Sequence, residues 1–356
     1  MATPPPLLPQ NMKTTPLDAS RRTTASAPRS LRPVRKAARP AAAAVLLLVS
    51  LIPAPAANVT LTTSNTMSGQ SGFTTGSHWS NSQAPSAAND YFVNTNFTLR
   101  TPQTSSATST FNGNSLTVNG GILGLANLQA GNNTTINNFT LTGGASIGNF
   151  VSGLQIISGT LAISGSAFVR LNTVDSVSRN ITIASQISGS GNMGLIQTGT
   201  LSLTGTGNTF SGTWTAGGAD VVIAGITYTN TAARVSTLDA SSSGSLGINS
   251  SLVANSYSII RIGYDWNTAG SLTLNENSTL FLDRNLTVGS LSISGTALAE
   301  GEYSYAFLST TYAGFFNTTG SGGSITVGAI PEPSSFAALA GGTVLFGCGF
   351  FRRRRS

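Results

Sequence analysis

Residues 199–205 read Gly-Thr-Leu-Ser-Leu-Thr-Gly, and this stretch decides the fold class. Leu201 and Leu203 alternate with hydroxyl-bearing side chains, and a glycine stands at each end. An apolar residue at every second position is typical of a β-strand with one buried and one exposed face. The stretch therefore predicts a short, half-buried strand between two turns.

The same pattern recurs throughout the body of the chain. It occupies residues 115–120, 140–144, 159–165, 180–185, 199–205, 219–225, 270–275, 278–283, 290–295 and 323–328. The first inward apolar residues fall at intervals of twenty in Leu141, Leu161, Ile181, Leu201 and Val221, and at twenty and nineteen in Leu252, Leu272 and Leu291. No segment of the body shows convincing helical periodicity. The body is predicted to be all-β and repetitive.

A repeat of about twenty residues, made of short strands and Gly or Asn turns, fits one coil of a parallel β-helix. Each coil buries its Leu, Ile and Val row against the next coil. Gly and Asn supply corners with positive φ. We expect a right-handed parallel β-helix, a β-solenoid, with capped ends. An antiparallel β-sandwich and a loosely ordered Ser/Thr-rich chain are the alternatives, and the apolar strand positions disfavour the second.

The 356-residue chain has a formal net charge of +7, which suggests a nucleic-acid partner until the charges are located. Of the 18 Lys and Arg residues, eight precede residue 41 and four follow residue 351. The six between them are all arginine, and the same segment holds ten of the 11 acids, so the body is slightly acidic. Without a basic groove the chain offers no surface that tracks phosphates. We expect no nucleic-acid partner.

The first apolar run, residues 41–52, follows a basic, Pro-rich stretch and is too short to cross a bilayer comfortably. Ala54 and Ala56 supply the small residues of a cleavage site behind it. A basic region, a short apolar region and an A-x-A site together describe a secretory signal peptide. Residues 1–56 are therefore predicted to direct the chain to the export translocon.

The last apolar run, residues 334–351, contains no charged residue. As a helix it would be about 27 Å long, close to the thickness of the bilayer hydrocarbon. The positive charges that follow it would stay cytoplasmic and leave the body outside. These charges are Arg352, Arg353, Arg354 and Arg355. We expect an exported chain with a transmembrane helix at residues 334–351.

Pro331, Glu332 and Pro333 precede this run, and the arginines follow it. In order and spacing, residues 331–355 resemble the PEP-CTERM sorting signal of Gram-negative bacteria. The resemblance implies that an exosortase, a membrane-embedded cysteine transpeptidase, acts near Pro-Glu-Pro and releases the protein from its helix. It also implies a transient membrane anchor, followed by a place on the cell surface or in the extracellular matrix among exopolysaccharide and biofilm.

The stretch at 194–212 is similar to the autotransporter-associated β-strand repeat. The matching positions are Gly199, Thr200, Leu201, Leu203, Gly205, Asn208, Thr209 and Gly212, with Phe210 in place of the usual tyrosine. The units at 159–165 and 270–275 keep only the strand core. The resemblance implies a β-solenoid with a degenerate repeat.

Both ends of the body are predicted to be closed. Residues 57–110 form a cap region, and the solenoid runs over residues 111–328. An uncovered end would invite edge pairing with another sheet. The residues expected to cover the first coil are Trp79, Tyr91, Phe92 and Phe97. The aromatic residues of 298–327 are expected to close the other end.

No catalytic constellation stands out in the body. A polysaccharide lyase or hydrolase on this fold would need a base beside carboxylates, yet the body has no lysine and its acids are scattered. Its one histidine is His78, and the only cysteine, Cys348, lies in the last apolar run. Three or more acids or arginines gathered on one face would indicate a catalytic groove. We expect no metal, no cofactor and no catalysis, with a carbohydrate-active β-helix enzyme as the alternative.

The body also offers candidate contacts to a sugar chain. Arg261, Tyr264, Asp265 and Trp266 combine stacking and hydrogen-bonding groups. Further aromatic candidates are Trp214, Tyr228 and Tyr257. These three are expected to be exposed, as are Tyr264 and Trp266, and packing in a solenoid corner is the alternative for all of these residues. Several Asn-x-Thr sequons could accept glycans, among them those at Asn96, Asn138, Asn180 and Asn277. The leading hypothesis is an exported, non-catalytic structural or adhesive protein among exopolysaccharide.

Overall fold

The computed structural model describes residues 56–171, 179–218, 221–223 and 226–328. All described residues belong to the compact unit Ala54–Ser356. The predicted signal peptide, apart from Ala56, lies outside the described residues, as do the sorting signal and the helix expected at 334–351. None of the helices in the described part is long and apolar enough to span a membrane.

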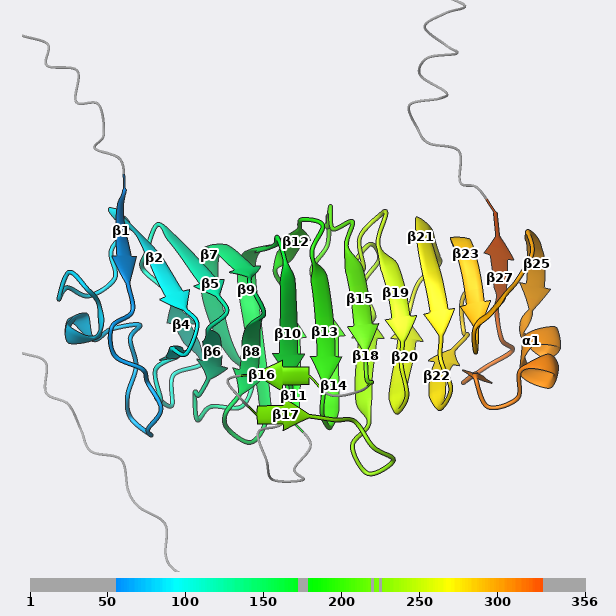
Figure 1. Cartoon of the computed structure of the whole chain (residues 1–356), viewed down its shortest axis with the longest axis horizontal. Coiled ribbons are helices and arrows are strands. Elements are labelled where there is room, and N and C mark those ends of the chain that lie inside the picture. The colour runs from blue at the N-terminus through cyan, green and yellow to red at the C-terminus, as the bar shows by residue number, and fades with distance from the viewer. Residues whose placement is uncertain (1–55, 172–178, 219–220, 224–225, 329–356) are drawn as a thin grey trace, which may run out of the picture. The chain divides into compact units, whose positions relative to one another are not determined.

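Two large sheets build the described body (Figure 1). The first contains β1 (Ala57–Thr60), β2 (Asn89–Asn94), β4 (Thr108–Thr110), β5 (Ser115–Asn119), β7 (Asn132–Thr142), β9 (Leu154–Ile163), β11 (Arg179–Ile183), β12 (Gln186–Ser188), β14 (Gly199–Leu203), β18 (Ser236–Ala240), β20 (Ser258–Ile262), β22 (Ser278–Phe281) and β26 (Phe316–Asn317). The second contains β3 (Thr98–Arg100), β6 (Ile122–Leu125), β8 (Ala145–Asn149), β10 (Ser166–Arg170), β13 (Asn192–Ile196), β15 (Thr213–Ala216), β19 (Ser251–Ala254), β21 (Trp266–Leu274), β23 (Leu286–Ile293), β24 (Thr296–Ala297), β25 (Gly301–Ser304) and β27 (Ser324–Val327).

The chain alternates between the two sheets, and nearly all neighbouring strands in each sheet run parallel. Successive strands of one sheet therefore come from successive coils, and the result is an all-β solenoid of about eight turns. Figure 1 shows these strands stacked side by side in chain order. The predicted solenoid is confirmed, and the β-sandwich alternative is excluded by the parallel pairing.

Bends inside the long strands shape each coil. Strand β7 pairs with β4 through its first half and with β5 through its second half, and its register against β9 shifts between Ile136 and Phe139. Strands β21 and β23 show a similar shift between Thr268 and Ser271. Because a bulge bends the strand that carries it, each long strand turns from one side of the coil to the next.

The core is a continuous column of aliphatic side chains inside the coils. In the opening stretch Leu201 and Leu203 are fully buried, whereas Thr200 and Ser202 are only half-buried. Leu201 packs between the equivalent strand positions Ile181 and Leu238 of the neighbouring coils. The alternation that predicted a half-buried strand is thus observed directly.

The interval of twenty residues is right for only part of the solenoid. Ile181 pairs with Leu201, and Leu272 pairs with both Leu252 and Leu291. Leu161, however, pairs with Ile187 rather than with Ile181, and Leu141 with Ile163 rather than with Leu161. Turns between strands face solvent, so their length varies without disturbing the stacked core.

Val221 breaks the predicted row most clearly. Leu201 is followed in its row by Leu238, while Val221 belongs to the separate antiparallel hairpin of β16 (Val221–Ile223) and β17 (Ile226–Tyr228). The hairpin is part of an insertion between β15 and β18. A second insertion carries the short helix α1 (Tyr305–Thr311), which the sequence pattern did not predict.

Aromatic residues pack at both ends of the column. Trp79 and Tyr91 lie 4.8 Å apart, centroid to centroid, in an edge-to-face pair that also contacts Phe111, and Phe73 completes the cluster. A 3-10 turn, η1 (Gly76–His78), leads into Trp79. Phe97 is partly buried against the core, whereas Phe92 is half-buried outside it.

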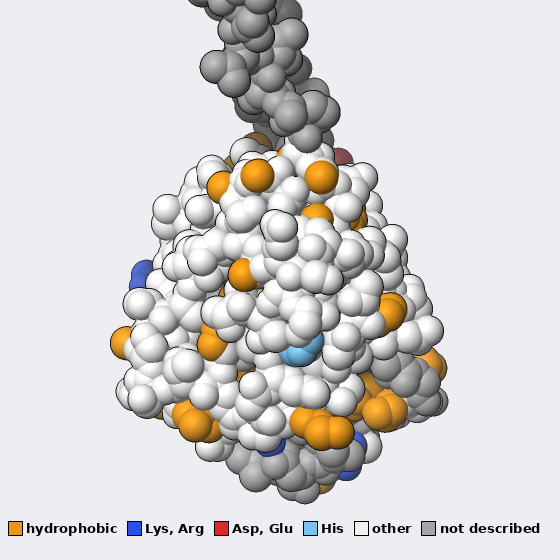
Figure 2. Space-filling model, turned by 90° about the vertical axis from the view of Figure 1, so that its left-hand side faces the viewer, with side chains coloured by type: hydrophobic (Ala, Val, Ile, Leu, Met, Phe, Trp, Pro, Cys, Tyr) orange, Lys and Arg blue, Asp and Glu red, His pale blue; other side chains and the backbone are white. Residues whose placement is uncertain are grey.

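At the other end Leu308 of α1 is fully buried, and several partly buried aromatic residues pack against the core, namely Tyr303, Tyr305, Tyr312 and Phe315. Figure 2 shows that the end of the solenoid near β1 presents mostly uncharged polar surface with small, separate hydrophobic patches. Such a surface gives little driving force for stacking on another sheet.

Candidate ligand-binding groove

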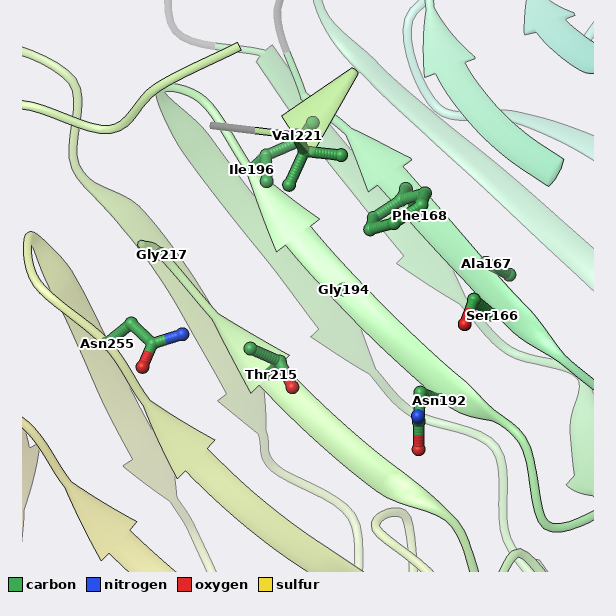
Figure 3. Close-up of a pocket in the computed structure, with 10 residues that line it drawn as sticks. All are labelled: Ser166, Ala167, Phe168, Asn192, Gly194, Ile196, Thr215, Gly217, Val221 and Asn255. Atoms are coloured by element: carbon green, nitrogen blue, oxygen red, sulfur yellow. The ribbon is translucent and has the colours of Figure 1, made fainter. Parts of the chain in front are cut away.

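A groove of about 300 Å³ lies on the outer side of the second sheet, where β10, β13, β15 and β19 run side by side (Figure 3). It is lined by Ser166, Ala167, Phe168, Asn192, Gly194, Ile196, Thr215, Gly217, Val221 and Asn255. Met193 and Trp214 point into the core, so strand alternation turns their neighbours outward into the groove. The groove is thus a direct consequence of the strand pattern.

Hydrogen-bonding side chains form a row along one side of the groove. The parallel register places Ser166 beside Asn192, Asn192 beside Thr213, and Thr213 beside Ser251. Neighbouring strands lie about 4.8 Å apart, so the row repeats an amide or hydroxyl at that spacing. Asn192 is exposed, and no described residue is hydrogen-bonded to its side chain. The row is available to an extended polar ligand.

An aromatic ring lies beside this row. Phe168 is half-buried on β10, and a methyl group added to Gly194 on the adjacent strand would be only 2.6 Å from its ring. The missing side chain at Gly194 therefore lets the ring lie across β13. Phe168 packs there with Ile122, Ile196 and Val221, so its position is fixed by apolar contacts.

The hairpin β16–β17 forms one wall of the groove. Val221 and Tyr228 pair across it and pack onto the outer apolar cluster of Ile122 and Ile196. The Tyr228 hydroxyl accepts a hydrogen bond from Nη1 of Arg170, which anchors the hairpin to β10. Figure 3 shows Val221 and Ile196 together at one end of the groove and Asn192 toward the other. The groove thus has an apolar end and a polar end.

The chemistry available in the groove is neutral. None of its ten lining residues is titratable at ordinary pH, so the lining supplies no acid, base or cation ligand of its own. Within the described ranges no three His, Cys, Asp or Glu residues gather as a metal site. An apolar ring beside oriented amide and hydroxyl groups is suited to binding an uncharged polar ligand.

The predicted exposure of the tryptophans is wrong. Trp214 and Trp266 are each 1% exposed, and their Nε1 atoms donate to the backbone oxygens of Leu246 (3.0 Å) and Gly247 (3.4 Å). Tyr228 is likewise buried. Both tryptophans occupy inward strand positions, where a large apolar side chain stabilises the core more than it would at the surface.

The four residues proposed to contact a sugar do not form one surface. Trp266 points inward, and the half-buried Tyr264 uses its hydroxyl to accept from the Leu246 amide at 3.1 Å, while burial raises the pKa of that hydroxyl. Arg261 stacks its guanidinium 3.7 Å from the Phe281 ring centroid on the first sheet. Asp265 accepts a hydrogen bond from the Asn285 amide at 3.1 Å.

The remaining titratable candidates have structural roles. His78 lies 2.9 Å from the Asn65 amide nitrogen through its Nδ1 atom. Burial raises the pKa of Asp239, and the positive charge of Arg261 opposes that effect. Burial would also raise the pKa of Asp283, but hydrogen bonds from Thr318 and Thr319 outweigh it and lower the pKa.

Sequence reasoning missed the groove. Its signal is an outward glycine within a strand, as at Gly194, next to an outward aromatic residue on the preceding strand, as at Phe168. Recognising it requires the register between β10 and β13, because the two residues belong to different coils.

Comparison with known proteins adds a sorting motif to this β-solenoid. The family model of the PEP-CTERM protein-sorting motif matches residues 329–355. No curated protein and no solved structure matches the chain. The motif implies an exported protein that is processed by an exosortase, and a β-solenoid fits a surface protein.

The residues assigned to sorting and processing all lie in this match, outside the described residues: Pro331, Glu332, Pro333, Arg352, Arg353, Arg354 and Arg355. Ala54 of the predicted cleavage site also lies outside, and Ala56 is the first described residue. The resemblance to the autotransporter-associated repeat, the signal peptide and the transmembrane helix stay predictions.

Proposed function

We propose that this chain is a non-catalytic surface protein that holds exopolysaccharide in the groove beside Phe168. The observation that carries the proposal is the lining of the groove, which joins an aromatic ring to exposed amide and hydroxyl groups without a titratable side chain. Sugar rings present both apolar faces and hydroxyl groups, and such a lining complements both. The sorting motif supports the proposal because it implies export.

The polar row extends beyond the groove and supports an adhesive role. Ser251 is followed along the sheet by Ser271, whose amide donates to the Ser251 hydroxyl at 3.0 Å, and then by Ser290. A long polymer laid along this row would make many weak contacts at once. Linked weak contacts give an avidity well above that of any single one.

The test is retardation of the full-length chain in gels that contain polysaccharide from a host that makes the protein. Asn192→Ala removes an exposed amide that no described residue bonds, so the fold should be unaffected. Loss of one hydrogen bond of about 1 kcal/mol should weaken binding roughly fivefold. Asn267→Ala, at an exposed position on β21, is the matched control. Equal retardation of Asn192→Ala and wild type, or no retardation of the wild type, would contradict the proposal.

One observation favours a second candidate, a polysaccharide lyase. Arg170 and Arg100 flank the Phe150 ring, and Arg179 donates to the backbone oxygen of Asn149 at 2.9 Å, so three arginines surround residues 148–150. A lyase would need carboxylates beside such an arginine to hold a cation or the substrate, and no described carboxylate forms a salt bridge with Arg100 or Arg170. Release of unsaturated sugars from an acidic polysaccharide, followed by ultraviolet absorbance, would support this candidate against the non-catalytic one.

A further inference from the structure

A row of two arginines and two glycines crosses the outer side of the second sheet. The parallel register places Arg100 on β3 beside Gly124 on β6, Gly124 beside Gly148 on β8, and Gly148 beside Arg170 on β10. All four positions face outward, on the same side of the sheet as the groove. Arg170 stands two residues beyond Phe168 on β10, so the row borders the apolar end of the groove.

Phe150 fills the space above the two glycines. A methyl group would lie 2.5 Å from the ring at Gly124 and 2.8 Å from it at Gly148, so only glycine admits the ring at these positions. The guanidinium carbon of Arg100 lies 5.6 Å from the ring centroid, and that of Arg170 lies 5.5 Å from it. Tyr228 stacks on Arg170 at 5.1 Å. Arg100 is therefore held at the free end of a cation–π stack.

Arg100 carries a charge that no described residue neutralises. Its exposed fraction is 7%, its Nε atom is enclosed without a hydrogen-bond partner, and no described side chain bonds its terminal nitrogens. Unlike Nε, the terminal nitrogens of Arg100 are not enclosed, so they reach solvent. Burial lowers the pKa of Arg100. Arg170 differs, because its Nη1 atom donates to Tyr228.

The acids of the described body lie elsewhere. One, Asp90, is on β2 of the first sheet, and the others follow residue 235: Asp239, Asp265, Glu276, Asp283, Glu300 and Glu302. A partly buried guanidinium without a counter-ion is costly, and cation–π contacts compensate only part of that cost. A planar carboxylate would complete the site, because a guanidinium can hold both of its oxygens.

We propose that Arg100, held against Phe150 beside Arg170, binds carboxylate groups of an acidic polysaccharide, so that the polymer held by this protein is a polyuronate. The proposal rests on the proposed function and names its ligand class. The groove would bind the uncharged faces of the sugars, and Arg100 would select polysaccharides that carry carboxylate groups.

The first test compares two polymers with one backbone, polygalacturonate and its methyl-esterified form, in which the carboxylates are neutral. We expect the full-length chain to bind polygalacturonate about tenfold or more tightly than the ester, and the preference to fall with added salt. Arg100→Gln should abolish the preference. Arg261→Gln should keep it, because Arg261 also stacks on a ring but lies on the first sheet beside Asp239. Equal affinity of the wild type for both polymers, or a preference that Arg100→Gln leaves intact, would overturn the proposal.

A second measurement separates this proposal from the proposed function. At fixed ionic strength, galacturonate should raise the Tm of wild type and of Arg261→Gln more than galactose does, and should not do so for Arg100→Gln. If both polymers bind equally and galacturonate has no effect, the groove function stands and the carboxylate site is refuted. If neither these polymers nor the host polysaccharide binds but galacturonate stabilises the protein through Arg100, the proposed function fails and the carboxylate site stands.

Discussion

Asparagine and glycine set the corners of the coils. Asn96, Asn138 and Asn277 have φ angles of 70°, 54° and 60°, a left-handed conformation that asparagine tolerates better than most residues. Each of the three begins an Asn-x-Thr sequon, and backbone geometry explains why asparagine stands there. Asn180, which begins another sequon, accepts a hydrogen bond from the Thr200 amide at 3.0 Å through its side chain. Glycan attachment at these sites stays a prediction.

The burial of the two tryptophans could be predicted from strand alternation alone. Trp214 stands between Thr213 and Thr215, so alternation alone places it in the core, and it is fully buried. The prediction that Trp214 stacks on a sugar rested on the properties of the indole ring and not on the inward position of the residue in its strand. In this chain the strand position decides, because the core column needs large apolar side chains at every coil.

Asp283 gives a prediction on pH dependence. Its Oδ1 atom accepts from the Thr318 hydroxyl at 2.7 Å and from the Thr319 amide at 2.6 Å. Because its folded-state pKa is lowered, its carboxylate stabilises the fold above the usual pKa of about 3.9, and this contribution is lost as pH falls through the lowered value. Asp283→Asn should therefore lower the Tm by a few degrees at pH 7, for a loss of about 1 kcal/mol.

Thermal unfolding followed from pH 7 to pH 2 checks this expectation. The difference in Tm between wild type and Asp283→Asn should shrink toward zero at the acid end. Glu300→Gln, at an exposed carboxyl that no described residue bonds, serves as the control. A difference that is the same at pH 7 and pH 2 would show that the charge of Asp283 does not contribute.

The inserted hairpin β16–β17 is the element that builds the groove wall. Its sequence resembles the other strands, which is why residues 219–225 were predicted to be one more coil strand. In the structure Val221 pairs antiparallel with Tyr228 instead of joining Leu201 and Leu238. Helix α1 is a similar case: Ser304 accepts from the Phe307 amide at 3.3 Å at its start, but seven residues are too few for a periodic signal.

Tyr228→Phe should loosen this hairpin. It removes the hydroxyl that accepts from Arg170 and keeps the ring that packs on Ile122 and Ile196. A lost hydrogen bond of about 1 kcal/mol should raise amide hydrogen exchange in β17 roughly fivefold, while exchange in β13 stays unchanged. Tyr257→Phe, a residue outside the hairpin, is the control. Unchanged exchange in β17 would mean that apolar packing alone holds the hairpin.

The solenoid as a whole is held by contacts between adjacent coils. A coil has no core of its own, since each inward row is completed by the rows before and after it. Leu201 lies in the middle of this column, between Ile181 and Leu238. A cavity there removes contacts from both neighbouring coils at once.

Leu201→Ala should destabilise the protein by about 2–5 kcal/mol, because the fully buried side chain leaves a cavity that stacked coils cannot close. Thr200→Ala, one position along the strand and facing outward, should change stability by less than about 1 kcal/mol. Chemical unfolding followed by circular dichroism measures both. Equal losses for the two variants would contradict the assignment of inward and outward faces.

The sequence by itself determined the all-β class, the strand segments, the inward face of each strand and the sorting motif, because each of these depends on residues close together in the chain. A period of two, a glycine corner or a Pro-Glu-Pro tail can be recognised without knowing what packs against it. Each of the ten segments predicted as strands overlaps a strand of the structure, although several of those strands begin well before the predicted segment.

Only the tertiary structure decided the coil lengths, the hairpin, the groove and the arginine stack. Arg100, Phe150 and Arg170 belong to different coils, and they meet because Gly124 and Gly148 leave room for the ring between them. The turns that separate successive coils differ in length, so the residue that follows another along the sheet cannot be counted from the sequence. The packing of the whole core fixes the register between coils. That register decides which residues lie side by side on the outer surface.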